Sequence, residues 1–132
     1  MKYLIAFIPL LFIMSNCRKS ETQCVAGTGG HVNIVVYVNH NGNGILNYDS
    51  HPDTAFLKFN TLSSPGTAPA NYDTFFVGEG GEDHIHCENL KCGSYFIYRT
   101  AFDSVSNSRY TGSLGISFTE TAGEIDTVVN VN

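Results

Sequence analysis

The chain contains one long aromatic and apolar segment, residues 84–102, with the sequence HIHCENLKCGSYFIYRTAF. Its first residues alternate polar and apolar side chains, which is the pattern of a strand with one buried face. Leu90 lies in a tight turn, and Gly93 then begins a second strand, which carries Tyr95, Phe96, Ile97, Tyr98, Ala101 and Phe102. The segment therefore predicts two strands, 84–88 and 93–102, joined by a turn.

Five further segments have the composition of short strands: residues 31–39, 54–59, 74–77, 109–118 and 124–131. In the first of them, β-branched and apolar side chains alternate at Val32, Ile34, Val36 and Val38. This pattern favours a sheet, and no segment after Met14 has a helical period. Seven short strands separated by turns predict one all-β domain, a seven-stranded antiparallel β-sandwich with Greek-key connections.

The N-terminus has the layout of a secretory signal peptide, because Lys2 precedes an apolar run over residues 3–14. The run is shorter than the roughly 20 residues that a membrane-spanning helix needs. A polar, glycine-rich segment follows Cys17, with the sequence RKSETQCVAGTGG. We therefore expect a signal peptide over residues 1–16, a flexible tether over 17–30 and the sandwich domain over 31–132.

The pentapeptide Ile13-Met14-Ser15-Asn16-Cys17 resembles the lipobox of bacterial lipoproteins, whose cysteine becomes the lipidated first residue of the mature protein. Met14 stands where that pattern usually has Leu, and Asn16 where it usually has Gly or Ala. The resemblance implies lipidation of Cys17 and a protein held at the outer membrane of the cell envelope by its anchor. The alternative is an ordinary secreted protein that is cleaved near the same position.

Charge and motif content exclude several functions. The chain carries 12 Asp and Glu against 7 Lys and Arg, one of which, Lys2, lies in the expected signal peptide. An acidic chain without a basic stripe is not expected to bind nucleic acid. The sequence contains no G-x-S-x-G motif and no phosphate-binding loop, so we expect a protein that is not an enzyme. The longest predicted loop, residues 60–73, is either a ligand-binding loop or an inert surface excursion.

The heptapeptide Asn89-Leu90-Lys91-Cys92-Gly93-Ser94-Tyr95 resembles the N-L-x-x-G-x-Y turn of transthyretin-like sandwiches. These include carboxypeptidase regulatory-like domains and repeat modules of bacterial surface adhesins, and the resemblance covers residues 31–131. It implies that Leu90 closes the end of the core and that Gly93 allows the turn. It also implies that Tyr95 buries its ring while its hydroxyl reaches a polar partner.

The same resemblance implies a structural or binding module with a surface protein or a glycan as partner, because a fold alone fixes no activity. The sequence departs from the family at Cys87, where the family usually has a large apolar residue. Cys87 and Ile85 are expected to point inward, and His84 and His86 outward. A thiol is accommodated there as a small apolar group.

Three cysteines remain if Cys17 is lipidated, and an oxidising compartment favours a disulfide between two of them. In the topology of the family, the first strand and the strand that begins at Gly93 would both run antiparallel to the last strand. Their starts would then lie at the same end of the sandwich, which favours a Cys24–Cys92 disulfide with Cys87 left over. The alternatives are a Cys87–Cys92 disulfide across the turn and three reduced thiols.

His84 and His86 lie two residues apart on one face of a predicted strand. Side chains at this spacing are about 6–7 Å apart along the strand, so the two imidazoles can chelate zinc or copper if another ligand is present. His31, His40, His51 and the adjacent Asp83 are candidates for that ligand. The alternative is a pair of exposed polar residues on the solvent side of a sheet.

Overall fold

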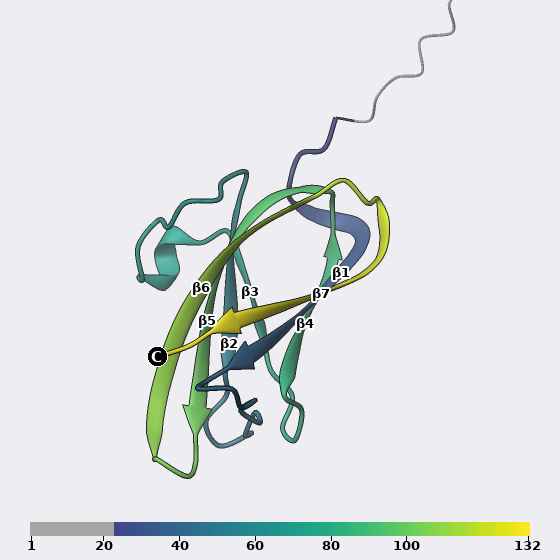
Figure 1. Ribbon diagram of the computed structural model, residues 1–132. Coiled ribbons are helices and arrows are strands. Elements are labelled where there is room, and N and C mark those ends of the chain that lie inside the picture. The colour runs from purple at the N-terminus through teal and green to yellow at the C-terminus, as the bar shows by residue number, and fades with distance from the viewer. Residues whose placement is uncertain (1–22) are drawn as a thin grey trace, which may run out of the picture.

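The computed structural model describes residues 23–132, which form a β-sandwich of two sheets (Figure 1). The three-stranded sheet has the order β4-β1-β7, and the four-stranded sheet has the order β3-β2-β5-β6. The strands are β1 (Thr28–Asn39), β2 (Thr54–Phe59), β3 (Thr74–Val77), β4 (His84–Leu90), β5 (Gly93–Asp103), β6 (Ser108–Phe118) and β7 (Ala122–Asn130). The short 3-10 helix η1 (Pro69–Asn71) lies in the loop between β2 and β3.

The predicted number and order of strands are confirmed, and most bounds coincide, while β1 begins three residues earlier than expected. The expected signal peptide and the lipidation of Cys17 lie outside the described residues. Within the segment expected to be a tether, β1 already begins at Thr28, and Ala26 is buried in the core. Residues 24–30 therefore pack with the domain. Among the described residues, none forms a helix that is long and apolar enough to cross a membrane.

The prediction of a fully antiparallel sandwich was wrong at one strand pair. β1 and β7 are parallel, in a register that runs from His31 opposite Ala122 to Asn39 opposite Asn130. The reason lies in the end of β6, where Phe118 pairs with Gly93 at the start of β5. The start of β1 lies at this same end of the sandwich, so the short link from β6 delivers β7 to the start of β1. β7 then continues in the direction of β1.

The core lies between the two sheets and is built from alternating side chains. The predicted inward face of β1 is confirmed, because Val32, Ile34 and Val36 are fully buried and Val38 is nearly so. Leu90, which ends β4, is also fully buried. The Tyr95 ring is buried as well, and its hydroxyl accepts a hydrogen bond from Gly27 N at 3.0 Å and donates to the Lys91 carbonyl at 2.5 Å. Leu90 and Tyr95 thus close one end of the sandwich.

The Cys24–Cys92 disulfide links the segment before β1 to the turn before β5, and Cys87 is free and buried, as predicted. The premise that β1 runs antiparallel to β7 was wrong, but the two strand starts do lie together. Lys91 N donates to the Gly27 carbonyl at 2.9 Å. Gly93 has a φ of 147°, and a Cβ atom there would collide with the backbone of Ala26. The chain therefore needs a glycine where the two segments meet.

Candidate metal centre

His84 and His86 lie on β4, at the edge of the three-stranded sheet. Ile85 and Cys87 alternate with them and are buried, so the predicted orientations of these four residues are confirmed. Burial raises the pKa of the Cys87 thiol to about 12, which keeps it protonated at neutral pH. The two imidazoles are therefore presented outward by a strand whose other face is fixed in the core.

The two histidines and Glu82 bring three possible metal ligands together. The Nε2 atoms of His84 and His86 are 3.0 Å apart, and His84 Nε2 lies 3.6 Å from Glu82 Oε2. One ligand atom from each of the three residues lies within 4.8 Å of the others. Ligand atoms at zinc distances in a tetrahedron are about 3.4 Å apart, which is close to the two distances from His84 Nε2.

Neighbouring groups fix the orientation of His84. Its Nδ1 atom lies 2.9 Å from Asp83 Oδ1, and its ring packs against Tyr37 with the centroids 5.1 Å apart. A carboxylate on the second ring nitrogen is the usual partner of a metal-binding histidine, because it fixes the tautomer in which the other nitrogen is free to coordinate. Asp83 thus supports the site from behind and is not positioned as the third ligand.

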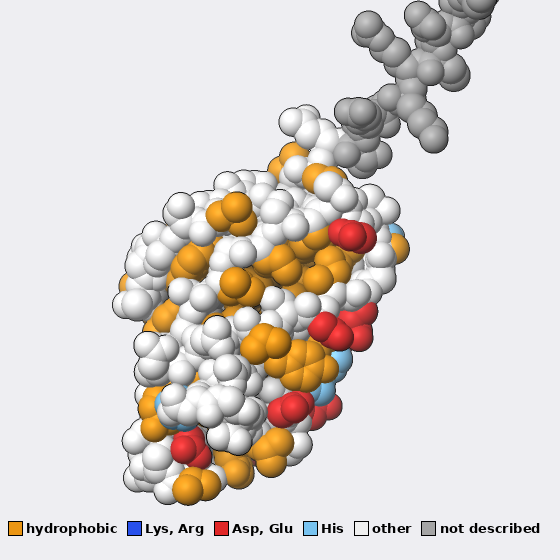
Figure 2. Space-filling model, in the orientation of Figure 1, with side chains coloured by type: hydrophobic (Ala, Val, Ile, Leu, Met, Phe, Trp, Pro, Cys, Tyr) orange, Lys and Arg blue, Asp and Glu red, His pale blue; other side chains and the backbone are white. Residues whose placement is uncertain are grey.

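The surroundings of the three ligands are acidic. A hollow of about 160 Å³ beside His86 is lined by Glu79, Glu82 and Glu88 together with Val77. The pKa of Tyr37 is raised by partial burial and then by the nearby carboxylates of Asp126, Asp83 and Glu124. Acidic and histidine side chains gather along one side of the molecule (Figure 2). A negative potential of this kind attracts a cation.

The other predicted ligands lie elsewhere, so that part of the prediction was wrong. His40 stacks on Tyr110 and its Nδ1 atom lies 3.0 Å from the Val131 carbonyl. His51 stacks on Phe102. His31 lies on β1, six residues before Tyr37, the residue that pairs with His84. The sequence did contain a signal for the third ligand, since Glu82, His84, His86 and Glu88 follow one another at the two-residue period of a strand face.

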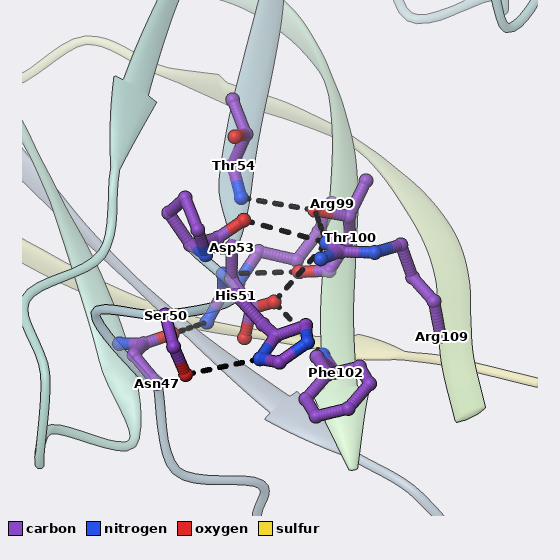
Figure 3. A network of polar contacts seen from close by, with 10 residues as sticks. Asn47, Ser50, His51, Asp53, Thr54, Arg99, Thr100, Phe102 and Arg109 are labelled. Carbon is purple, nitrogen blue, oxygen red and sulfur yellow. Dashed lines mark hydrogen bonds and ion pairs between the residues drawn. The ribbon is translucent and has the colours of Figure 1, made fainter. Parts of the chain in front are cut away.

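A buried polar network at the core was not predicted. Arg99 is fully buried, and its guanidinium donates to Asn47 Oδ1 at 3.3 Å and to the Thr100 carbonyl at 3.2 Å. Asp53 is also fully buried, and its Oδ1 atom accepts from Phe102 N at 2.8 Å and from Arg109 at 3.4 Å. Figure 3 shows how these groups converge from β5, β6 and the segment before β2. The buried members of the network lie inside the sandwich.

Burial shifts the pKa values of the two charged groups in opposite senses. It lowers the pKa of Arg99 to about 10 and raises that of Asp53, while both arginines and the Phe102 N–H favour the Asp53 carboxylate. Among the described residues, Arg99 Nε and Asp53 Oδ2 are buried without a hydrogen-bond partner. Burial of these two polar atoms without partners costs desolvation free energy.

Comparison with protein-family models, with curated proteins and with solved structures finds no match for this chain. Ideas about its function therefore depend on its own residues and their geometry. Of these, the cluster of Glu82, His84 and His86 has the most specific chemistry, because two imidazoles and a carboxylate form a ligand set that zinc and copper prefer.

Proposed function

We propose that this protein is a metal-binding β-sandwich of the cell envelope that holds a zinc or copper(II) ion between Glu82, His84 and His86. The observation that carries the proposal is the convergence of one ligand atom from each residue within 4.8 Å. His84 is oriented by Asp83 and by Tyr37, so little ordering is needed before an ion binds. Ile85 and Cys87 fix β4 in the core beneath the site, and a rigid strand supports a preorganised set of ligands.

The ligand count favours a site with an open position. Structural zinc sites usually have four protein ligands, whereas three ligands leave one position for water or for a group from another molecule. Glu79 and Glu88 line the same hollow and add negative charge beside the ion. We propose a binding role, such as metal capture or delivery at the membrane, and no catalytic one.

Calorimetric titration of the purified protein with zinc chloride and with copper sulfate tests the metal proposal. The wild type is expected to bind one ion, and a His84→Ala, His86→Ala double variant is expected to bind at least about 100-fold more weakly. A Glu82→Gln variant should bind the ion about tenfold more weakly than the wild type, because it keeps the shape of the side chain and removes the charge. His31→Ala is the matched control, since it removes an exposed histidine from another part of the sheet.

Equal affinity in the wild type and in the double variant would rule out this site, even if the protein bound metal elsewhere. Thermal unfolding gives an independent readout, because an ion that binds only the folded state raises its melting temperature. That increase should appear in the wild type and in the His31→Ala variant and be absent from the double variant.

We also propose that the chain is anchored in the outer membrane through a lipid on Cys17. The support is the signal-like N-terminus and the lipobox-like pentapeptide that ends at Cys17. Metabolic labelling with a fatty acid, in a bacterial host that processes lipoproteins, should label the wild type and leave a Cys17→Ala variant unlabelled. Equal labelling of the two proteins would contradict the anchor.

Membership of the transthyretin-like sandwiches is proposed on the same heptapeptide, Asn89 to Tyr95. Leu90 is buried, Gly93 has a positive φ and the Tyr95 hydroxyl is hydrogen-bonded, which are the roles that the motif implies. The parallel pairing of β1 with β7 departs from the expected antiparallel arrangement. An experimental structure with Leu90 facing solvent would contradict the proposed membership.

A further inference from the structure

The outer face of the four-stranded sheet carries a row of aromatic rings. Phe75 on β3 pairs with Phe56 on β2, and Phe56 pairs with Tyr98 on β5, so the three rings lie side by side across three strands. Tyr72, from the loop between β2 and β3, stacks on Tyr98 with the centroids 6.0 Å apart and lies 5.7 Å from Phe56. Phe75 remains 61% exposed. We call Phe56, Tyr72, Phe75 and Tyr98 the aromatic platform.

A groove of about 410 Å³ opens over this platform, and its lining is mostly apolar with three polar residues. Thr54, Asp73 and Thr74 line it together with three of the four rings and Pro69. The volume is within the usual range for a small-molecule site, roughly 300–1,000 Å³. An aromatic floor bordered by hydroxyl and carboxylate groups matches a ligand that has one apolar face and polar edges.

The charge of the groove selects among such ligands. Asp73 Oδ1 accepts from Lys58 Nζ at 3.0 Å, and Asp73 Oδ2 accepts from Phe59 N at 2.7 Å. The carboxylate is therefore balanced by one cation, and its remaining lone pairs can still accept hydrogen bonds. Because the charges of Asp73 and Lys58 cancel, the groove favours a neutral ligand over an ammonium or a phosphate. Either of these would add a charge without a partner.

The loop that carries Tyr72 is held in place before any ligand arrives. The Tyr72 hydroxyl donates to the Gly66 carbonyl at 2.7 Å, and Asn71 Nδ2 donates to the Pro65 carbonyl at 2.8 Å. Tyr72 N also donates to the Pro69 carbonyl at 3.1 Å. A preformed platform reduces the ordering cost of binding.

We propose that the aromatic platform binds a neutral sugar ring of a cell-surface or environmental glycan. The C–H groups on one face of a pyranose carry small positive charges and pack on the negative faces of aromatic rings. Its hydroxyl groups, at the ring edge, would face Thr54 and Asp73. A second copy of this chain, paired at the free edge of β3, is the competing occupant.

An array of neutral and anionic oligosaccharides, probed with the purified protein, tests the proposal. The wild type should bind neutral glycans, and calorimetry with the strongest of them should show at least tenfold weaker binding in the Phe75→Ser and Tyr72→Ala variants. Val128→Ser is the matched control, because Val128 is 52% exposed on β7, in the other sheet, and its loss should leave glycan binding unchanged. Zinc binding should be the same in the wild type and in the two platform variants.

Three outcomes would overturn the proposal. The first is a wild type that binds no glycan on the array or binds only anionic ones. The second is unchanged glycan affinity in both platform variants, with circular dichroism showing that they are folded. The third is concentration-dependent self-association of the wild type that Phe75→Ser abolishes, which would assign the platform to a second copy of the chain.

Discussion

A Cys24→Ser, Cys92→Ser double variant is expected to lose about 4 kcal/mol of unfolding free energy relative to the wild type. The disulfide closes a loop with a sequence separation of 68, and the chain-entropy model gives about 4 kcal/mol for a loop of that length. This is a large part of the 5–15 kcal/mol that stabilises a typical domain. Urea denaturation followed by circular dichroism measures the difference.

A Cys17→Ser variant is the matched control for the disulfide, since Cys17 lies outside the described domain and its replacement should leave the urea midpoint unchanged. Peptide mapping under non-reducing conditions should recover one linked peptide pair that contains Cys24 and Cys92. Equal midpoints for the double variant and the wild type would contradict a stabilising role for the disulfide. A linked pair that contains Cys87 would contradict the pairing itself.

Replacement of Arg99 by methionine is expected to destabilise the protein by about 1–3 kcal/mol at neutral pH. The variant keeps much of the apolar stem but leaves the buried Asp53 carboxylate with the partly exposed Arg109 as its remaining cation partner. Arg99 and Arg109 both favour the Asp53 carboxylate, so without Arg99 the buried carboxylate has less compensating charge. The Asn47 amide also loses the donor to its Oδ1 atom.

The pH dependence of this loss has a definite sign. Burial raises the pKa of Asp53 above its ordinary value, so ionisation of Asp53 opposes folding, and Arg99 partly offsets that effect. Without Arg99 the pKa of Asp53 rises further. The destabilisation should therefore be smallest below the ordinary pKa of about 3.8 and grow as pH rises through the raised pKa of Asp53.

Urea denaturation across a pH series compares Arg99→Met with the wild type and with Lys91→Met, which removes an exposed basic residue. Lys91→Met should stay within about 0.5 kcal/mol of the wild type. In an Arg99→Met, Asp53→Asn double variant, part of the lost stability should return, because the buried charge is gone. A pH-independent loss in Arg99→Met would contradict the proposed coupling to Asp53.

Much of the fold follows from local patterns in the sequence. The alternation of Val32, Ile34, Val36 and Val38 predicted the inward face of β1, because side chains of a strand alternate between two faces. The Asn41-Gly42 turn was also predictable, and both residues have a positive φ, 52° and 86°. The direction of β7 could not be predicted, because it depends on which end of the sandwich β6 reaches. No local pattern in the sequence encodes that position.

The residues missed were those whose role depends on distant partners. Arg99 has the inward parity of Tyr95, Ile97 and Ala101, so its burial could have been inferred from the same alternation. Asn47 and Asp53 lie in loop segments without such a period, and their burial results from packing around Arg99. The histidine pair was predicted from its spacing, whereas Glu82 was missed because it precedes the strand, although it continues the same period.

The metal proposal is tested most directly by crystals of the protein grown with zinc, with diffraction data collected on both sides of the zinc absorption edge. We predict one strong anomalous difference peak within about 2.0–2.2 Å of a ligand atom from each of Glu82, His84 and His86. A zinc peak bound to other residues, with these three side chains unliganded, would contradict the account.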